Sequence, residues 1–261
     1  MATRISRRGF LKRAGAVVGA ASVGPMIVPA SALGLGGAPA PSERINIGLI
    51  GVGKQMRGHH GAMLGRAGVQ VLALCDVEAV RLERERARNN EHYAAQSGAA
   101  GYNGCKAFKD FRELVALADI DAVMVATPDH WHALASVEAL RAGKDVYCEK
   151  PMAHTVREGQ AMRDTTRRFG RVFQTGSQQR SSEEFRRACE IVRNGRIGRV
   201  HTVHVNVSGP PVECRLPGQP VPEGLDWDFW LGPAPERPYN ADIAPGVDFD
   251  GWPNWRAYSD Y

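Results

Sequence analysis

The chain has 261 residues, 43% of them hydrophobic and 23% charged, a balance that is ordinary for globular proteins and excludes a disordered or collagen-like chain. It carries 33 basic and 28 acidic residues, and the net charge of +5 raises the question of a nucleic-acid partner. The whole excess lies in the first thirteen residues, because Arg4, Arg7, Arg8, Lys12 and Arg13 precede the first acidic residue. The rest of the chain is electrically balanced, so no nucleic-acid binding is expected.

Residues 1–32 have the pattern of an export signal. Arg7 and Arg8 precede Phe-Leu-Lys, an apolar run follows from Ala14 to Val28, and Ala30-Ser31-Ala32 offers a small-residue cleavage site. Paired arginines in this setting resemble a twin-arginine signal. A retained membrane anchor is the alternative, but this Ala- and Gly-rich run with two prolines would span a bilayer poorly. We expect a periplasmic or otherwise exported protein, with residues 33–43 as a linker.

A short apolar run at Ile45–Ile50 ends in Gly51-Val52-Gly53, which predicts a buried strand entering a tight turn. A second run from Val69 to Leu74 leads to Asp76, 25 residues after Gly51. Glycines let the backbone approach a pyrophosphate, and a carboxylate at about this spacing accepts the ribose hydroxyls of NAD and repels the 2′-phosphate of NADP.

This glycine fingerprint is incomplete. The third glycine of G-x-G-x-x-G would be residue 56, which is Met56, and the next glycine is Gly58. An ordinary strand–turn–helix is therefore the alternative to a dinucleotide site.

Alternating helix and strand patterns follow along the chain. Helices are predicted over 77–95, 111–118 and 130–141, and strands over 120–126, 146–148 and 171–175. The first of these helices carries the i,i+3 pairs Glu78/Arg81, Glu83/Arg86 and Glu85/Arg88, which indicate a solvated face. The alternation predicts an α/β fold with a parallel, doubly wound Rossmann-type sheet over residues 44–175 and a ligand at the carboxyl ends of its strands.

Unusual polar residues follow two of these strands. One strand leads into Thr127-Pro128-Asp129-His130-Trp131-His132, and another into Glu149-Lys150-Pro151. A partly desolvated ammonium at Lys150 would polarise a substrate hydroxyl or carbonyl, whereas an ordinary solvated lysine is the alternative. No metal is expected, since His130 and His132 lack further ligands. The five cysteines form no disulfide framework, and Cys75 and Cys148 are expected to be buried thiols.

Taken together, these motifs resemble the Gfo/Idh/MocA oxidoreductases, NAD(P)-dependent enzymes named for glucose–fructose oxidoreductase and inositol dehydrogenase. The resemblance covers residues 44–261. It rests on the following motifs: Gly51-Val52-Gly53 with Gly58-His59, the turn 126–132, Cys148-Glu149-Lys150-Pro151, the segment 174–180 and the segment 227–233.

The resemblance implies roles for individual residues. Glu149, Lys150 and Pro151 would face the nicotinamide, with Lys150 as the catalytic or substrate-binding residue. Further cofactor-binding residues would be Gly51, Gly53, Gly58, Asp76, Thr127, Pro128 and His130. The implied cofactor is NAD, with NADP as the alternative.

The sequence after Gly170 predicts the start of a second, α+β domain over residues 176–261. A helix is expected at Glu183–Arg193 with a capping box at Ser181 and Glu184, and the alternation of Val203, Val205 and Val207 predicts a half-exposed strand. Residues 209–253 lack periodicity and are expected to pack over the site.

We expect this second domain to be incomplete. One strand makes no sheet, and the residues after Gly195 have too irregular a composition to bury a core of their own. In the resembled family a glycine-rich stretch and an Asp-x-x-x-His motif follow a similar Asp-Tyr, and no such motif occurs after residue 196.

The sequence thus leads to an NAD(P)-dependent oxidoreductase that transfers hydride on a sugar, cyclitol or glycoside. Two alternatives are a glycosidase of the same family that retains its NAD and a non-catalytic dinucleotide-binding fragment. The expected partners are a sugar-like substrate and the export machinery, and a homo-oligomer is left open.

Overall fold

The computed structural model describes residues 39–97, 102–207 and 209–261, and Arg44–Tyr261 form one compact unit. The expected signal over residues 1–32 and most of the expected linker lie outside the described residues. Within the described part, no helix combines the length and apolarity needed to cross a membrane.

Six strands form the frame. They are β1 (Ile45–Ile50), β2 (Val69–Cys75), β3 (Lys106–Phe108), β4 (Ala122–Val125), β5 (Asp145–Glu149) and β6 (Phe173–Gly176). Every pair is parallel and the order is β3-β2-β1-β4-β5-β6, the doubly wound order of dinucleotide-binding domains. The predicted fold class is therefore confirmed.

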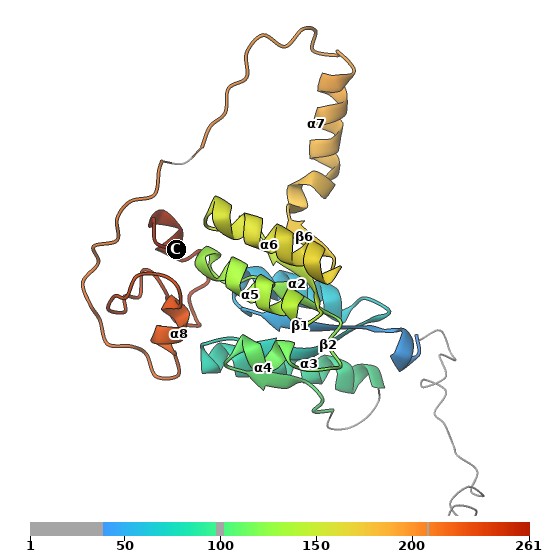
Figure 1. The fold of residues 1–261 in the computed structure, drawn as a ribbon, viewed down its shortest axis with the longest axis vertical. Helices are drawn as coiled ribbons and strands as arrows, with labels where there is room; N and C mark the ends of the chain where they lie inside the picture. Colours follow the sequence, from blue (N-terminus) through green and yellow to red (C-terminus); the bar gives the residue numbers. More distant parts are fainter. Residues whose placement is uncertain (1–38, 98–101, 208) are drawn as a thin grey trace, which may run out of the picture. The chain divides into compact units, whose positions relative to one another are not determined.

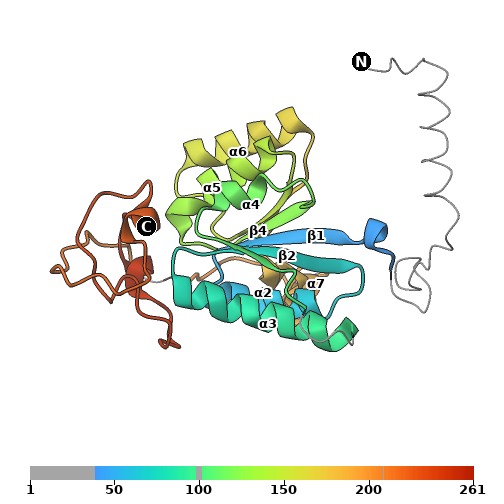
Figure 2. The ribbon, with the colours of Figure 1, turned by 90° about the horizontal axis from the view of Figure 1, so that it is seen from below.

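Helices cover both faces of this sheet. Figure 2 shows α2 and α3 on one face and α4, α5 and α6 on the other, while Figure 1 gives the order along the chain. The helices are α2 (Lys54–Leu64), α3 (Ala79–Ser97), α4 (Phe111–Val115), α5 (Asp129–Arg141), α6 (Val156–Phe169), α7 (Glu183–Arg193) and α8 (Trp227–Leu231), with short 3-10 turns η3 (Pro41–Glu43), η4 (Gln178–Ser181) and η5 (Asn254–Ala257). The covered strands carry fully buried side chains such as Leu49, Val71 and Val123.

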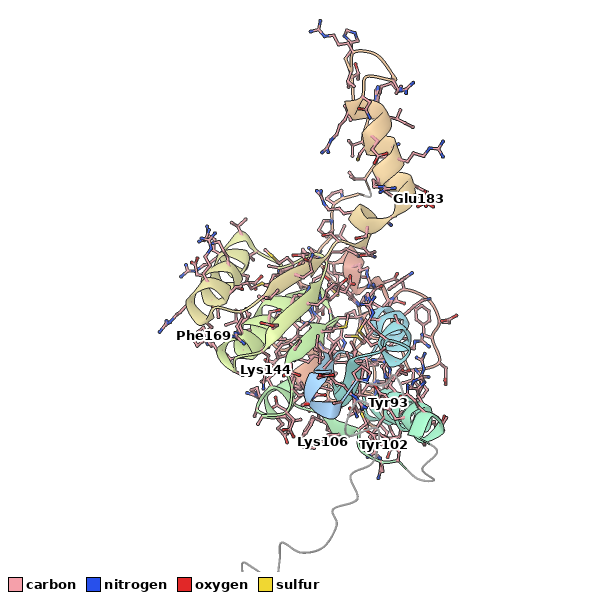
Figure 3. All side chains as sticks on the ribbon, turned by 90° about the vertical axis from the view of Figure 1, so that its right-hand side faces the viewer. Tyr93, Tyr102, Lys106, Lys144, Phe169 and Glu183 are labelled. Atoms are coloured by element: carbon pink, nitrogen blue, oxygen red, sulfur yellow. The ribbon has the colours of Figure 1, made fainter. Side chains whose placement is uncertain are left out.

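Helix α7 has the predicted bounds but not the predicted cap. Ser182, not Ser181, precedes the helix, and it makes no capping hydrogen bond to the backbone. Ser181 already belongs to η4, so it cannot also cap α7. No residue of α7 is buried, and Figure 3 shows its side chains standing clear of the sheet from Glu183 onward.

The predicted strand at Val203, Val205 and Val207 is wrong. The backbone there forms no strand, and all three valines are exposed, with Val207 at 84%. Apolar residues that alternate with a period of two indicate a backbone that is able to join a sheet. Joining a sheet needs a neighbouring strand, and the described residues supply none at this place.

Residues 211–261 bury a core of their own, contrary to the expectation from their composition. Trp227 and Trp230 stack at 4.9 Å between ring centroids, and Trp255, Tyr239 and Ile243 pack around them. Large aromatic side chains bury enough area to hold a short irregular segment together. Figure 2 shows this segment, in orange to red, beside the carboxyl ends of the strands.

The cysteines are unpaired. Cys75, Cys105, Cys148 and Cys214 are buried and Cys189 on α7 is exposed, which confirms the expected burial of Cys75 and Cys148. Burial raises the pKa of Cys105 and of Cys148 to about 12 and that of Cys75 further still.

A buried polar network joins α2 to α3. His60 is fully buried, with Nδ1 3.1 Å from Glu85 Oε2 and Nε2 3.0 Å from Asn89 Oδ1. Asn89 in turn donates to the Val71 carbonyl of β2 at 3.2 Å. Because both ring nitrogens of His60 face oxygen acceptors, Glu85 is the counter-charge of a ring that donates twice.

Substituting Glu85→Gln should destabilise the protein by about 2–3 kcal/mol, because a buried charged partner is lost. Burial by itself would raise the pKa of Glu85. The hydrogen bond and charge of His60, helped by Arg88, outweigh burial and lower this pKa below its usual 4.5. The contribution of Glu85 is therefore complete above pH 4.5 and is lost as the pH falls through the lowered value. Urea unfolding at pH 7 and at pH 4 tests this. The matched control is Glu83→Gln, an exposed pair with Arg86, which should change stability by less than about 0.5 kcal/mol.

Candidate cofactor and active site

A cavity of about 1050 Å³ lies at the carboxyl ends of the strands. Its size is at the upper end of the about 300–1,000 Å³ that is usual for small-molecule sites. The ends of β1, β2, β4 and β5 form one wall, and residues from the segment 222–256 form the other. Of the predicted site residues, these line the cavity: Gly51, Gly53, Asp76, Thr127, Pro128, Glu149, Lys150 and Pro151.

The turn after β1 requires its first glycine. Gly51 has φ +77°, and a Cβ there would stand 2.9 Å from the backbone nitrogen of Thr127. At Gly53, by contrast, a Cβ would meet no atom within 4 Å, so the backbone is open to the cavity. Gly53 precedes α2, and no side chain caps this helix end. Amide groups of the first helical turn are thus available to an anion.

Met56 does not disturb this turn, although it occupies the third position of the fingerprint. Its side chain is fully buried and packs with Leu49, Val71 and Leu74 in the core beneath α2. The incomplete fingerprint therefore alters the packing under the helix and leaves the helix end accessible.

Asp76 at the end of β2 is buried and connects two loops. Its Oδ2 accepts the Val52 N–H at 2.8 Å and its Oδ1 accepts the Glu78 N–H at 3.0 Å, while Arg81 lies 3.5 Å away. The predicted Glu78/Arg81 pair does not form, because Glu78 instead accepts the backbone amides of Val80 and Arg81 at the start of α3. The other two predicted pairs of α3 are present.

The segment after β4 brings a hydroxyl and a carboxylate to the cavity. The Thr127 Oγ1 atom is buried and has no hydrogen-bond partner among the described residues, so it is free to meet a ligand. Asp129 begins α5 and lines the cavity. Burial raises the pKa of Asp129, although His132, Arg256 and Lys150 oppose the shift.

The Glu149-Lys150-Pro151 segment follows β5. Glu149 is buried, and its Oε1 lies 2.8 Å from His59 Nε2 of α2, while its Oε2 accepts the Lys150 N–H at 3.2 Å. Burial and then the charge of Glu149 raise the pKa of the neighbouring Tyr147. Lys150 itself is exposed at the cavity, so the predicted partial desolvation of its ammonium is not present in this structure.

Two predicted cofactor residues do not reach the cavity. Gly58 lies on the exposed side of α2, one helical turn beyond Gly53. His130 is buried behind the wall, where its Nε2 donates to the Trp230 carbonyl at 3.0 Å and its ring packs against Trp230 and Tyr261. This burial lowers the pKa of His130 to about 4, so the ring is neutral and structural.

The cavity is also lined by residues that the sequence did not single out, on α2 and on the second wall. Lys54 at the start of α2 contacts the Asp250 backbone and carboxylate, and Arg57 lies 3.6 Å from the same carboxylate. Arg256 places its guanidinium over Trp255 and Trp252, 4.1 and 4.8 Å from the ring centroids, and burial lowers its pKa. The sequence signals for the second wall were its prolines and tryptophans without periodicity and the 227–233 motif of the resembled family.

Four features together define a dinucleotide-binding Rossmann domain: a parallel, doubly wound sheet, a glycine turn, an open helix end and a buried carboxylate. The model of the oxidoreductase family GFO_IDH_MocA, NAD-binding Rossmann fold, matches residues 45–177, and the model of the family's C-terminal alpha/beta domain matches residues 211–261. The chain belongs to the Gfo/Idh/MocA oxidoreductase family and contains its NAD-binding domain.

Curated relatives include an enzyme named alpha-N-acetylgalactosaminidase from Shewanella oneidensis, 34% identical over 179 residues. A glycosyl hydrolase family 109 protein from Shewanella baltica is 33% identical over 179 residues. Each alignment covers 63% of this chain and 37% of the relative, so the chain matches little more than a third of their length.

Solved structures give the same fold. Scyllo-inositol dehydrogenase from Lactobacillus casei, crystallised with NAD(H) and scyllo-inositol, superposes with a TM-score of 0.51 at 25% identity, over 59% of this chain and 42% of the other. A probable dehydrogenase from Thermotoga maritima gives a TM-score of 0.50 at 28% identity, over the same shares of the two chains.

The residues of the cavity fit NAD. Gly51 and Gly53 form a cradle that a Cβ would narrow or strain, the uncapped end of α2 suits the pyrophosphate, and Asp76 suits a ribose diol. Thr127 Oγ1, next to the Gly51 turn, offers an unpartnered polar atom.

Two glycine substitutions should distinguish a glycine that NADH binding requires from one that affects only the stability of α2. Gly51→Ala should weaken NADH binding by about tenfold or more, because a Cβ at φ +77° is strained and clashes with Thr127. Gly58→Ala should leave NADH affinity unchanged and stabilise α2 by about 0.5–1 kcal/mol. Fluorescence titration with NADH and thermal unfolding check both, and a large loss of affinity in Gly58→Ala would contradict the placement of that residue.

Proposed function

We propose that this chain binds NAD in the cavity at the strand ends and serves an enzyme that transfers hydride on a sugar, cyclitol or glycoside. The observation that carries the proposal is the convergence of the glycine turn, Asp76 and Lys150 on one cavity. Inositol dehydrogenases among the structural neighbours support a polyol-like substrate.

The proposed binding mode assigns a part of the cofactor to each wall. The Gly51–Gly53 turn and the start of α2 take the pyrophosphate, and Asp76 accepts the adenosine ribose hydroxyls. Glu149, Lys150 and Pro151 line the same cavity after β5, which is three strands from β2 in the sheet order, and the proposal puts the nicotinamide there. Asp76 also disfavours a 2′-phosphate by charge, so we propose NAD rather than NADP.

Bound NAD supplies a hydride acceptor at nicotinamide C4. Lys150, exposed at the cavity, holds or donates a proton at the substrate oxygen whose carbon loses or gains hydride. Asp129 adds a carboxylate on the same side of the cavity, where it can accept a hydrogen bond from a substrate hydroxyl. Trp252 and Phe249 provide apolar surface on the facing wall against which a sugar ring can pack.

A glycosidase that retains its NAD is the second candidate. It is favoured by the curated relatives, which are named as an alpha-N-acetylgalactosaminidase and as glycosyl hydrolases. In such an enzyme transient oxidation of the sugar would be reversed after bond cleavage, so the chain's own residues would take the same places. Export through the pattern at residues 1–32 remains part of the proposal and rests on the sequence alone.

The two candidates differ in their products. The chain incubated with NAD and either myo-inositol, glucose or a nitrophenyl N-acetyl-α-galactosaminide should give net NADH if it is a dehydrogenase. Release of nitrophenol at constant NAD would assign it as a glycosidase. NADH binding without either product would support the third possibility, a non-catalytic dinucleotide-binding chain.

Lys150→Ala should reduce turnover by about 10²–10⁴-fold, which is the usual contribution of a positioned proton donor. NADH affinity should change by less than about threefold, because pyrophosphate and ribose contacts are untouched. Lys106→Ala, an exposed lysine on β3 outside the cavity lining, is the control and should leave both quantities unchanged. Full activity in Lys150→Ala would remove this residue from the mechanism.

A further inference from the structure

Two histidines from different helices contact the segment that carries Lys150. His59 of α2 contacts the Glu149 carboxylate at 2.8 Å, on one side of Lys150. His132 of α5 contacts the Pro151 carbonyl oxygen through Nδ1 at 2.6 Å, on the other side. Neither contact involves the Lys150 side chain, but together they fix the backbone of the segment that carries this side chain.

The second contact of His132 makes it the more informative of the two. Its Nε2 lies 3.0 Å from the carbonyl oxygen of Thr127, in the loop that follows β4. The ring therefore bridges the loop after β4 and the loop after β5, both of which line the cavity. His132 is 1% exposed, so water does not replace either contact.

Both partners of the ring are backbone carbonyls, which only accept hydrogen bonds. A neutral imidazole has a single N–H and would leave one nitrogen lone pair facing an oxygen lone pair at hydrogen-bond distance. An imidazolium donates to both carbonyls. The geometry therefore selects the charged ring.

The surrounding groups allow that charge. Asp129 on the same helix supplies a carboxylate that interacts with His132. The other titratable or charged groups around the ring and Asp129 are His130 on α5, Cys148 on β5, Lys150 and His154 after β5, and Arg256 from the C-terminal segment. Cys148 stays a neutral thiol and His130 a neutral ring at pH 7, so the positive charges near the ring come from Lys150, Arg256 and His154.

We propose that His132 is a positioning residue which, as an imidazolium, ties the Thr127 carbonyl to the Pro151 carbonyl and so holds Lys150 at the nicotinamide end of the cavity. The inference rests on the proposed NAD site. Deprotonation of His132 removes one of the two bonds and lets the two loops separate. The placement of Lys150 relative to the Thr127 loop is therefore expected to be lost as pH rises.

The protonation state of the ring can be measured without any ligand. Nitrogen-15 NMR of the histidine rings in the 261-residue chain at pH 7 should show hydrogen on both Nδ1 and Nε2 of His132, assigned through bonds to its own backbone. A ring with one protonated nitrogen at pH 6–7 would overturn the inference. This measurement determines the protonation state of His132 even if a variant fails to fold or the chain does not bind NAD.

NADH affinity as a function of pH tests the consequence. With the ring deprotonated at high pH, the unaltered chain should bind NADH about tenfold more weakly than at low pH, equivalent to about 1.4 kcal/mol, because the released loop with Thr127 and Pro128 lines the cofactor cavity. His132→Gln should bind NADH about tenfold more weakly at pH 6 and show no such step. His92→Gln, a histidine of α3 outside the cavity lining, should keep the step.

The outcomes separate the two proposals. A step of unchanged size in His132→Gln would assign the titration to another group and overturn the positioning role. Absence of NADH binding by the unaltered chain at every pH would instead reject the proposed function, and the ring protonation measured by NMR would still settle the state of His132.

Discussion

The hydrogen bond from the Val52 amide to the Asp76 carboxylate holds together the part of the molecule on which the site depends. It joins the turn after β1 to the end of β2 inside the protein, at 2.8 Å. Gly51 lets the chain turn there, and Asp76 also receives the Glu78 amide, so one carboxylate orders the starts of both α2 and α3. A carboxylate buried with two amide donors is satisfied without a bound ligand, and because it has capacity for further hydrogen bonds it can also serve a ligand in the cavity that it lines.

The second wall is held by longer connections. His130 and Trp131 both donate to the carbonyl of Trp230, about a hundred residues further along the chain. Trp230 in turn belongs to the aromatic cluster that gives residues 211–261 their core. The cavity is therefore closed by packing and neutral hydrogen bonds, whereas the ion pairs of Lys54 and Arg57 with the exposed Asp250 contribute little.

The sequence was most informative where structure is local. The bounds of β1 and α7 are as predicted, and those predicted for β2, α3, α4, β4, α5, β5 and β6 are off by at most about three residues, because apolar runs and helical periodicity depend on near neighbours. No bounds were predicted for α2, β3, α6 and α8. The S/T-x-x-E pattern was assigned to Ser181, where η4 competes for the serine, while the capping box that does form, at Thr155 and Glu158, was overlooked. The pattern alone does not say where a helix begins.

Prediction failed where contacts cross the chain. His130 follows a strand like a ligand-binding residue, but its position is decided by Trp230, which no local pattern connects to it. Gly58 was grouped with Gly51 and Gly53, although helical geometry turns it away from the cavity. The sequence points to His132 only as a rejected metal ligand and as part of the 126–132 motif, because the two carbonyls that it bridges become neighbours only in the folded sheet.

The distribution of thiols has a practical consequence for chemistry on this protein. Four of the five cysteines are buried, and burial keeps Cys75, Cys105 and Cys148 in the unreactive protonated form at neutral pH. Cys189, exposed on α7, is thus the one thiol open to alkylating reagents and oxidants. A fluorophore or spin label introduced through maleimide chemistry would attach there, on a helix that contributes no residue to the cavity lining, without any engineering of the sequence.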